Sequence, residues 1–99
     1  MNPAPPDLGP FLQAIADPAR RRILQVLKEK SSDTKNKDTG LCAGDIEGRV
    51  KLSQPTVSHH MRILEKAGLV KVKKQGTWRR YRRNQKLISQ MTSGLKTQL

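Results

Sequence analysis

Two neighbouring histidines, His59 and His60, lie in a stretch that reads LSQPTVSHHMRILEKAGLV over residues 52–70. Histidine can bind a metal, transfer a proton, or form hydrogen bonds with another molecule. At 100° per residue, a helix here places His60 among the apolar side chains and His59 on the opposite side. We therefore expect His60 at the edge of the core, held by a hydrogen bond, and His59 in solvent.

The outward side of this predicted helix carries polar side chains of the types that read base edges in the major groove of DNA. The expected base-reading residues are Gln54, Thr56, Ser58 and His59, with Ser53 and Arg62 nearer the DNA backbone. Polar residues on a helix surface are often only solvated, so this face alone leaves both interpretations open. The elements that flank the helix decide between them.

A basic strip follows the helix. Eight Lys and Arg residues and no acidic residue lie between Lys71 and Lys86, which leaves 12 of the 20 basic residues against eight acidic ones elsewhere. Such a strip attracts a polyanion, most commonly nucleic acid, whereas a face that only maintains solubility usually mixes both signs. We expect double-stranded DNA as the partner, contacted by Lys73, Lys74, Gly76, Thr77, Arg79 and Arg80.

Helix and strand signals surround this surface. Asp17-Pro18 is a capped helix start, Ser53 is placed to cap the helix that Gly68 ends, and Gln75-Gly76 is a turn between two strands. The predicted helices run from near Asp7, from 18 to about 30, over 41–50, from 53 to 68 and over 85–98, and the strands include Val70 to Val72 and Trp78 to Arg83. This order predicts a mainly α fold with a small β-hairpin, namely a winged helix-turn-helix of five helices plus wing.

The length of 99 residues, without internal repeats, indicates one domain. Four prolines within residues 1–10 predict an extended N-terminal arm, and the DNA-binding domain should span 11–98. Residues 31–40 contain no apolar side chain, so we expect a mobile loop there. With 34% apolar residues, one subunit has a thin core, and a homo-oligomer is expected.

Composition also bears on other function classes. No stretch is long and apolar enough to span a membrane, so a cytoplasmic protein without a membrane partner is expected. A non-specific nucleoid or RNA-binding protein is an alternative, but Trp78 and Tyr81 are few and expected to be packed rather than to stack on bases. An enzyme using Cys42 and a histidine is disfavoured, because neither histidine has an evident acidic partner beside it.

Several stretches resemble the ArsR family of bacterial winged-helix repressors. The resemblance lies in Asp17 to Leu24, in Leu52 to His60 with Leu64 and Ala67 to Val70, and in Gly76 to Tyr81, and it covers about residues 11 to 88. It implies a homodimer that represses transcription from a palindromic operator until an effector binds, with dimerisation through the first and last helices. The residues expected at that interface are Leu8, Phe11, Leu12, Ile15, Leu87, Ile88, Met91 and Leu95.

The sequence departs from this family at its metal sites. Metal-sensing members carry a cysteine pair, whereas Leu41-Cys42-Ala43-Gly44-Asp45 holds one thiol, and residues 85–99 contain no Asp, His or Glu. We expect no metal and no cofactor, and the residues identify no effector. Two interpretations of Cys42 stay open: a redox switch, or an inert cysteine that is partly buried. The family usually has glycine at the position of Lys51, which implies a positive φ there, so a lysine is expected to alter this turn slightly. Arg83 stands where the family usually has an aliphatic residue.

Overall fold

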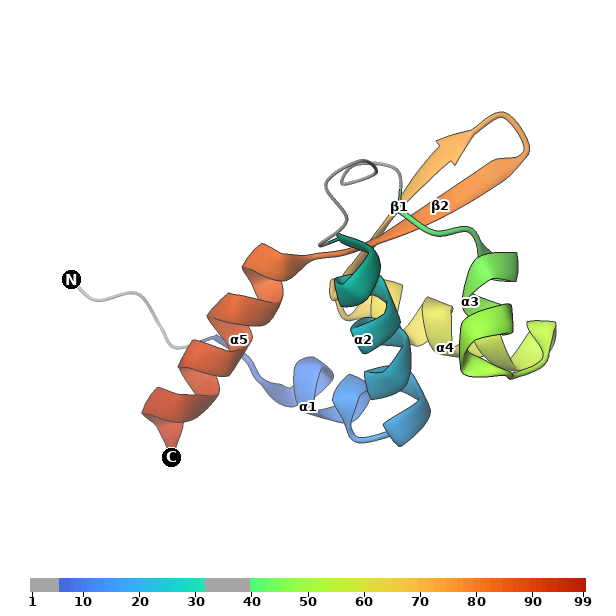
Figure 1. Ribbon diagram of the computed structural model, residues 1–99. Coiled ribbons are helices and arrows are strands. Elements are labelled where there is room, and N and C mark those ends of the chain that lie inside the picture. The colour runs from blue at the N-terminus through green and yellow to red at the C-terminus, as the bar shows by residue number, and fades with distance from the viewer. Residues whose placement is uncertain (1–5, 32–39) are drawn as a thin grey trace.

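The computed structural model describes residues 6–31 and 40–99, which form five helices and one hairpin. The elements in chain order are α1 (Gly9–Ile15), α2 (Pro18–Ser31), α3 (Ala43–Val50), α4 (Gln54–Lys66), β1 (Val70–Gln75), β2 (Trp78–Arg83) and α5 (Gln85–Gln98). Figure 1 shows α2, α3 and α4 gathered into one body, with the hairpin and α5 projecting from it in different directions. The predicted fold class, a winged helix-turn-helix, is confirmed.

The core lies where α2, α3 and α4 meet. Ile23 of α2, Ile46 of α3, and Val57 and Leu64 of α4 are completely buried. Buried residues recur at helical spacing in α2, with Val26 and Leu27 after Ile23, and in α4, with Met61 between Val57 and Leu64, so each of these helices has one apolar side that packs with Ile46. The opposite side of α4 is consequently left to solvent.

A tight turn sets α3 against α4. Lys51 ends α3 with φ 57° and ψ 44°, and its backbone N–H donates to the Glu47 carbonyl at 2.8 Å. Among the residues described, Lys51 is the one non-glycine with positive φ. The positive φ expected at this position is confirmed, and it costs a residue with a Cβ atom on the order of 1–2 kcal/mol.

The hairpin is antiparallel, with Val70 opposite Arg83 and Gln75 opposite Trp78. Gly76 in its turn has φ 59°, a conformation that glycine adopts without strain. Leu41 pairs with Tyr81 on the other edge of β2 through hydrogen bonds of 3.0 and 2.8 Å. This bridge holds Leu41 extended, so the helix predicted over 41–50 begins only at Ala43.

Polar side chains help to attach the start of α5 to the body. Asn84 donates to the Gly68 carbonyl at 2.9 Å and accepts from the Leu87 backbone N–H at 3.3 Å, which caps α5. Arg83 donates to the Leu24 carbonyl on α2 at 3.3 Å and to Gln85 at 2.8 Å, and burial lowers the pKa of its guanidinium. At the position where the family usually has an aliphatic side chain, Arg83 thus joins α2 by a hydrogen bond to a backbone carbonyl.

Two expectations concern segments that lie largely outside the described residues. The arm over 1–10 falls there except for residues 6–10, and the first helix begins at Gly9 rather than near Asp7. The Asp7 carboxylate accepts the Gly9 N–H at 3.0 Å and so lies just before the helix start. The loop over 31–40 falls there except for its two end residues. Across the described ranges, no helix has the length and apolar content to span a bilayer.

Candidate nucleic-acid interface

The outward side of α4 presents the side chains that the sequence indicated for base reading. Gln54 and His59 are exposed, and Thr56 and Ser58 are partly exposed. The Gln54 amide lies 3.5 Å from the Ser58 hydroxyl, one helical turn away, so these two side chains are adjacent on the surface. Ser53 and Arg62 are exposed at the start and middle of the same helix. All six predicted α4 contacts therefore lie on the surface of one helix.

The start of α4 differs in one detail from expectation. Ser53 is the N-cap residue, but its side chain makes no hydrogen bond to a backbone N–H of the first turn. Its hydroxyl instead lies 2.9 Å from the Thr56 hydroxyl. The expected side-chain cap is therefore wrong, and backbone N–H groups at the helix start remain without that partner. Such groups favour an anion, since they lie at the positive end of the helix dipole.

The inward side of α4 is fixed by a buried histidine. His60 is 8% exposed, and its Nδ1 accepts from Arg20 Nη1 at 3.3 Å. Arg20 also donates from Nε to the Ala14 carbonyl at 2.6 Å and lies 3.7 Å from the Asp17 carboxylate. Burial lowers the pKa of His60. The prediction that His60 is held at the edge of the core by a hydrogen bond is confirmed.

The wing places cations directly opposite cations. The pairing sets Lys71 against Arg82, Lys73 against Arg80 and Lys74 against Arg79. Like charges in opposed positions destabilise a hairpin. No acidic residue lies between 70 and 83 to offset them. A polyanion along the strands would relieve this repulsion.

Strand alternation divides the predicted wing contacts between two faces. Lys73 and Arg80 share one face, whereas Lys74 and Arg79 lie on the other, which also carries buried Tyr81. Gly76 and Thr77 form the exposed turn between the strands. The structure therefore brings all six residues onto one hairpin but does not turn them in a single direction.

Trp78 is a correction to the sequence interpretation. It was expected to be packed, yet its side chain is 63% exposed, while Tyr81 is buried as expected at 8%. The cause is alternation, because Tyr81 pairs with Val72 on the core face, and Trp78 lies three residues earlier on the opposite face beside Gln75. The strand pattern predicted the hairpin, but it did not indicate which aromatic residue faced inward.

A groove of about 440 Å³ separates α4 from the wing. Its lining includes Gln54 and Ser58 from α4, Thr77, Trp78 and Arg79 from the wing, and Cys42 before α3. The groove therefore joins predicted base-reading and wing residues across one concave surface.

Cys42 has a structural partner. Its thiol donates to the Asp45 carboxylate at 3.1 Å, its backbone N–H donates to the same oxygen at 3.3 Å, and the thiol bond lowers the pKa of Asp45. The Asp45 side chain thus accepts from the N-cap residue Cys42 at the start of α3. Within 6–31 and 40–99, His, Cys, Asp and Glu nowhere gather in a set of three that could hold a metal ion.

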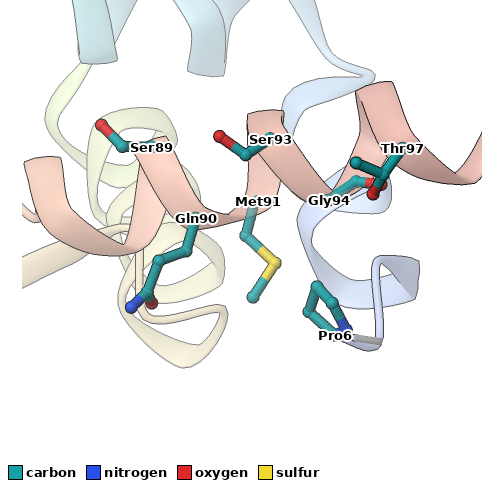
Figure 2. A pocket seen from close by; sticks show the side chains of 7 residues that line it. All are labelled: Pro6, Ser89, Gln90, Met91, Ser93, Gly94 and Thr97. Carbon is teal, nitrogen blue, oxygen red and sulfur yellow. The ribbon is translucent and has the colours of Figure 1, made fainter. Parts of the chain in front are cut away.

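A second surface, formed by α1 and α5, carries the residues expected to join two subunits. Leu8, Phe11 and Ile88 are buried within the subunit itself, so they belong to its core. Leu12 is 41% exposed, and Ile15, Leu87, Met91 and Leu95 are half-buried. Figure 2 shows Met91 and Pro6 lining an open groove of about 570 Å³ along α5. Apolar area therefore remains uncovered on this side.

Sequence reasoning missed two residues of this architecture. Arg20 lies within the stretch Asp17 to Leu24, and no local pattern indicated that it reaches His60, 40 positions away. Asn84, which ties the start of α5 to the end of α4, was not singled out. A polar residue directly before a predicted helix was the available signal for Asn84 as an N-cap.

Known proteins resemble this chain in sequence and in fold. The sequence pattern of a family described as "Helix-turn-helix domain" matches residues 15–73. An uncharacterized HTH-type transcriptional regulator of Methanocaldococcus jannaschii is 44% identical over 71 residues, which are 72% of this chain and 71% of that protein. The arsenical resistance operon repressor of Staphylococcus xylosus is 32% identical over 89 residues, 90% of this chain and 77% of that one.

A solved structure described as a possible transcriptional regulator for arsenical resistance has a TM-score of 0.70 and 27% identity, and the match covers 87% of this chain and 80% of that one. The helix-turn-helix match over residues 15–73 includes all of α2, α3 and α4 and the first part of β1. The likeness therefore extends over the helices that carry the candidate interface.

Proposed function

This chain belongs to the ArsR family of winged helix-turn-helix regulators and is a DNA-binding transcriptional repressor, and we propose that it acts as a homodimer on a palindromic operator. Its fold and family are those of transcriptional regulators. The proposed partner is double-stranded DNA, and we propose that the protein acts in the cytoplasm.

One observation carries the proposal, namely that α4 is divided between an anchored inner side and a free polar outer side. His60 and Leu64 hold the inner side, while Gln54, Ser58 and His59 face outward. A B-DNA major groove is wide enough for one helix, and amide, hydroxyl and imidazole groups can each bond to base edges. We assign base reading to Gln54, Thr56, Ser58 and His59.

Backbone contacts are assigned to the residues around that face. Ser53 and Arg62 flank the reading face on α4, and the wing supplies Lys73, Lys74, Gly76, Thr77, Arg79 and Arg80. Contacts with phosphate set the register of a protein on the duplex and release counterions, without carrying sequence information. The like-charged pairs across the wing support this assignment, since phosphate would relieve their repulsion.

Dimerisation is assigned to the apolar area that remains on α1 and α5. Leu12, Ile15, Leu87, Met91 and Leu95 supply it, while Leu8, Phe11 and Ile88 support it from the subunit core. A twofold dimer would place two copies of α4 in successive major grooves about 34 Å apart. The thin core of one subunit is a further argument for a partner copy.

Selection of bound fragments from a pool of genomic duplexes tests the proposed function. We expect an inverted repeat to be enriched, and its complex should survive competition by excess random duplex. Equal displacement by random and selected duplexes would instead support a non-specific nucleoid protein. Preference for single-stranded RNA over every duplex would support the RNA-binding alternative.

A further inference from the structure

Trp78 is a large apolar side chain left in solvent at the wing. It is 63% exposed, and it is the single tryptophan of the chain. Isolated apolar residues on a surface are common and need no function. This one, however, shares a strand face with Lys73 and Arg80, on a hairpin without acidic side chains. An indole among cations that have no acidic neighbour on the hairpin is a suitable surface for a ligand that is both anionic and partly apolar.

Trp78 and Arg79 alternate in direction along β2, but both line the groove at the start of this strand, and the groove has a composition that matches this kind of ligand. Gln54 and Ser58 on its α4 side are polar, Arg79 on the wing side is cationic, and Trp78 contributes an aromatic ring. The sugar-phosphate backbone of DNA has the same alternation of anionic phosphates and apolar deoxyribose carbons. On the α4 side of the same groove, Gln54 and Ser58 keep the base-reading role assigned above, and the backbone would lie on the wing side.

The relation between helix and wing favours one occupant of the groove. If α4 lies in a major groove, as proposed above, a strand of backbone separates it from the adjacent minor groove. The wing flanks α4 across the groove, so that strand would pass between them. We propose that Trp78 packs its indole ring on the deoxyribose of this strand while Arg79 contacts the adjoining phosphate. This assignment rests on the proposed mode of DNA binding.

The contact would raise affinity without adding sequence discrimination. Tryptophan buries a large area and often contributes a dominant share of binding energy at interfaces. Sugar and phosphate are the same at every base pair, so cognate and random duplexes should benefit equally. Loss of the ring should weaken binding roughly tenfold, the factor that corresponds to about 1.4 kcal/mol.

The single tryptophan makes the contact directly observable. The full-length protein would be titrated with a random duplex of about 30 base pairs at about 50 mM salt, conditions that favour binding without the operator. We expect the duplex to protect Trp78 fluorescence from quenching by acrylamide. Inorganic polyphosphate, which carries phosphates but no sugar, should bind the wing and leave the indole accessible. The sugar contact would be overturned if polyphosphate protected Trp78 from quenching as well as the duplex does. It would also be overturned if raising the protein concentration without DNA gave the same protection.

Variants separate this inference from the proposed function. Trp78→Ala should bind the random duplex roughly tenfold more weakly, and Trp78→Phe should retain most of the affinity. Leu99→Ala removes another exposed apolar side chain, 97% exposed at the C-terminus, and should change nothing. Unaltered melting temperatures for all three would show that folding is intact. If the wild type and Trp78→Ala bind the duplex equally well, the Trp78 contact is refuted and the proposed function is not. If the wild type binds no duplex at all, the proposed function is refuted.

Discussion

Arg20 at the start of α2 joins His60 on the recognition helix, α4, through a 3.3 Å contact between its Nη1 and the imidazole Nδ1. A guanidinium group can only donate, so Nδ1 must accept and His60 must be neutral. Arg20 is itself fixed by the Ala14 carbonyl at 2.6 Å. The inner side of α4 is thus oriented by a hydrogen bond that protonation of His60 would abolish.

The first prediction is a loss of stability on mild acidification. Burial lowers the pKa of His60 from its ordinary value of 6.5, an effect larger than the opposing influence of Asp17, and Arg20 and His59 lower it further. The unfolded chain then binds a proton at a higher pH than the folded chain. The free energy of unfolding should therefore fall as the pH drops through 6.5 and level off below the folded pKa.

Urea unfolding at a series of pH values measures this effect. His60→Asn keeps an acceptor near the position of Nδ1 but cannot titrate, so it should remove most of the slope in this range. His59→Asn, a matched change at the exposed neighbour, should retain the slope. A wild type as stable at about pH 5 as at about pH 7 would contradict the role given to His60.

A second prediction concerns the turn between α3 and α4. Lys51→Gly should stabilise the protein by roughly 1 kcal/mol, because glycine adopts the observed positive φ without strain. Arg49→Gly, an exposed position inside α3, should instead destabilise by about 1 kcal/mol. Chemical denaturation of the two variants provides the measurement. Destabilisation of both variants would show that Lys51 is not strained in solution.

A third prediction separates base reading from backbone binding. His59→Ala should lower discrimination between selected and random duplexes by roughly 1–3 kcal/mol. Arg79→Ala should weaken binding to both duplexes alike and reduce the steepness of the salt dependence by about one unit. Quantitative gel shifts at several salt concentrations would measure both effects. If the two variants lost the same affinity for selected and random duplexes at every salt concentration, the assignment of His59 to base reading and Arg79 to backbone binding would be wrong.

A fourth prediction addresses the subunit interface. Leu12→Asp places a charge at an apolar position that is 41% exposed in the subunit. Each interface residue occurs twice in a twofold dimer, so the dimer should weaken roughly 100-fold or more. Leu99→Asp, at the exposed C-terminus, should leave the dimer intact. Sedimentation that shows the same mass for Leu12→Asp and wild type would exclude α1 from the interface.

Local signals predicted much of the fold. The Asp17 carboxylate accepts the Ala19 N–H at 2.7 Å, as the Asp-Pro helix start indicated, and this bond lowers the pKa of Asp17. Gly68 has φ 80° just beyond the end of α4, as expected for a helix terminator. Each of these features depends on one residue and its immediate neighbours, which is why the sequence contains the signal.

Features that depend on distant partners were not predictable in the same way. The bridge between Leu41 and Tyr81 delays the start of α3, and it joins residues 40 positions apart. The exposure of Trp78 depends on which face of the hairpin meets the helices. At the candidate site, helical spacing placed His59 and His60 on opposite sides, but the partner of His60 depended on how α2 packs against α4.

The mass of the complex formed on a selected operator fragment tests the central claim most directly. Native mass spectrometry should find two chains on one duplex, whose enriched half-sites have centres about 10–10.5 base pairs apart. A complex of one chain per duplex, or half-sites at a spacing that two copies of α4 cannot span, would contradict the account.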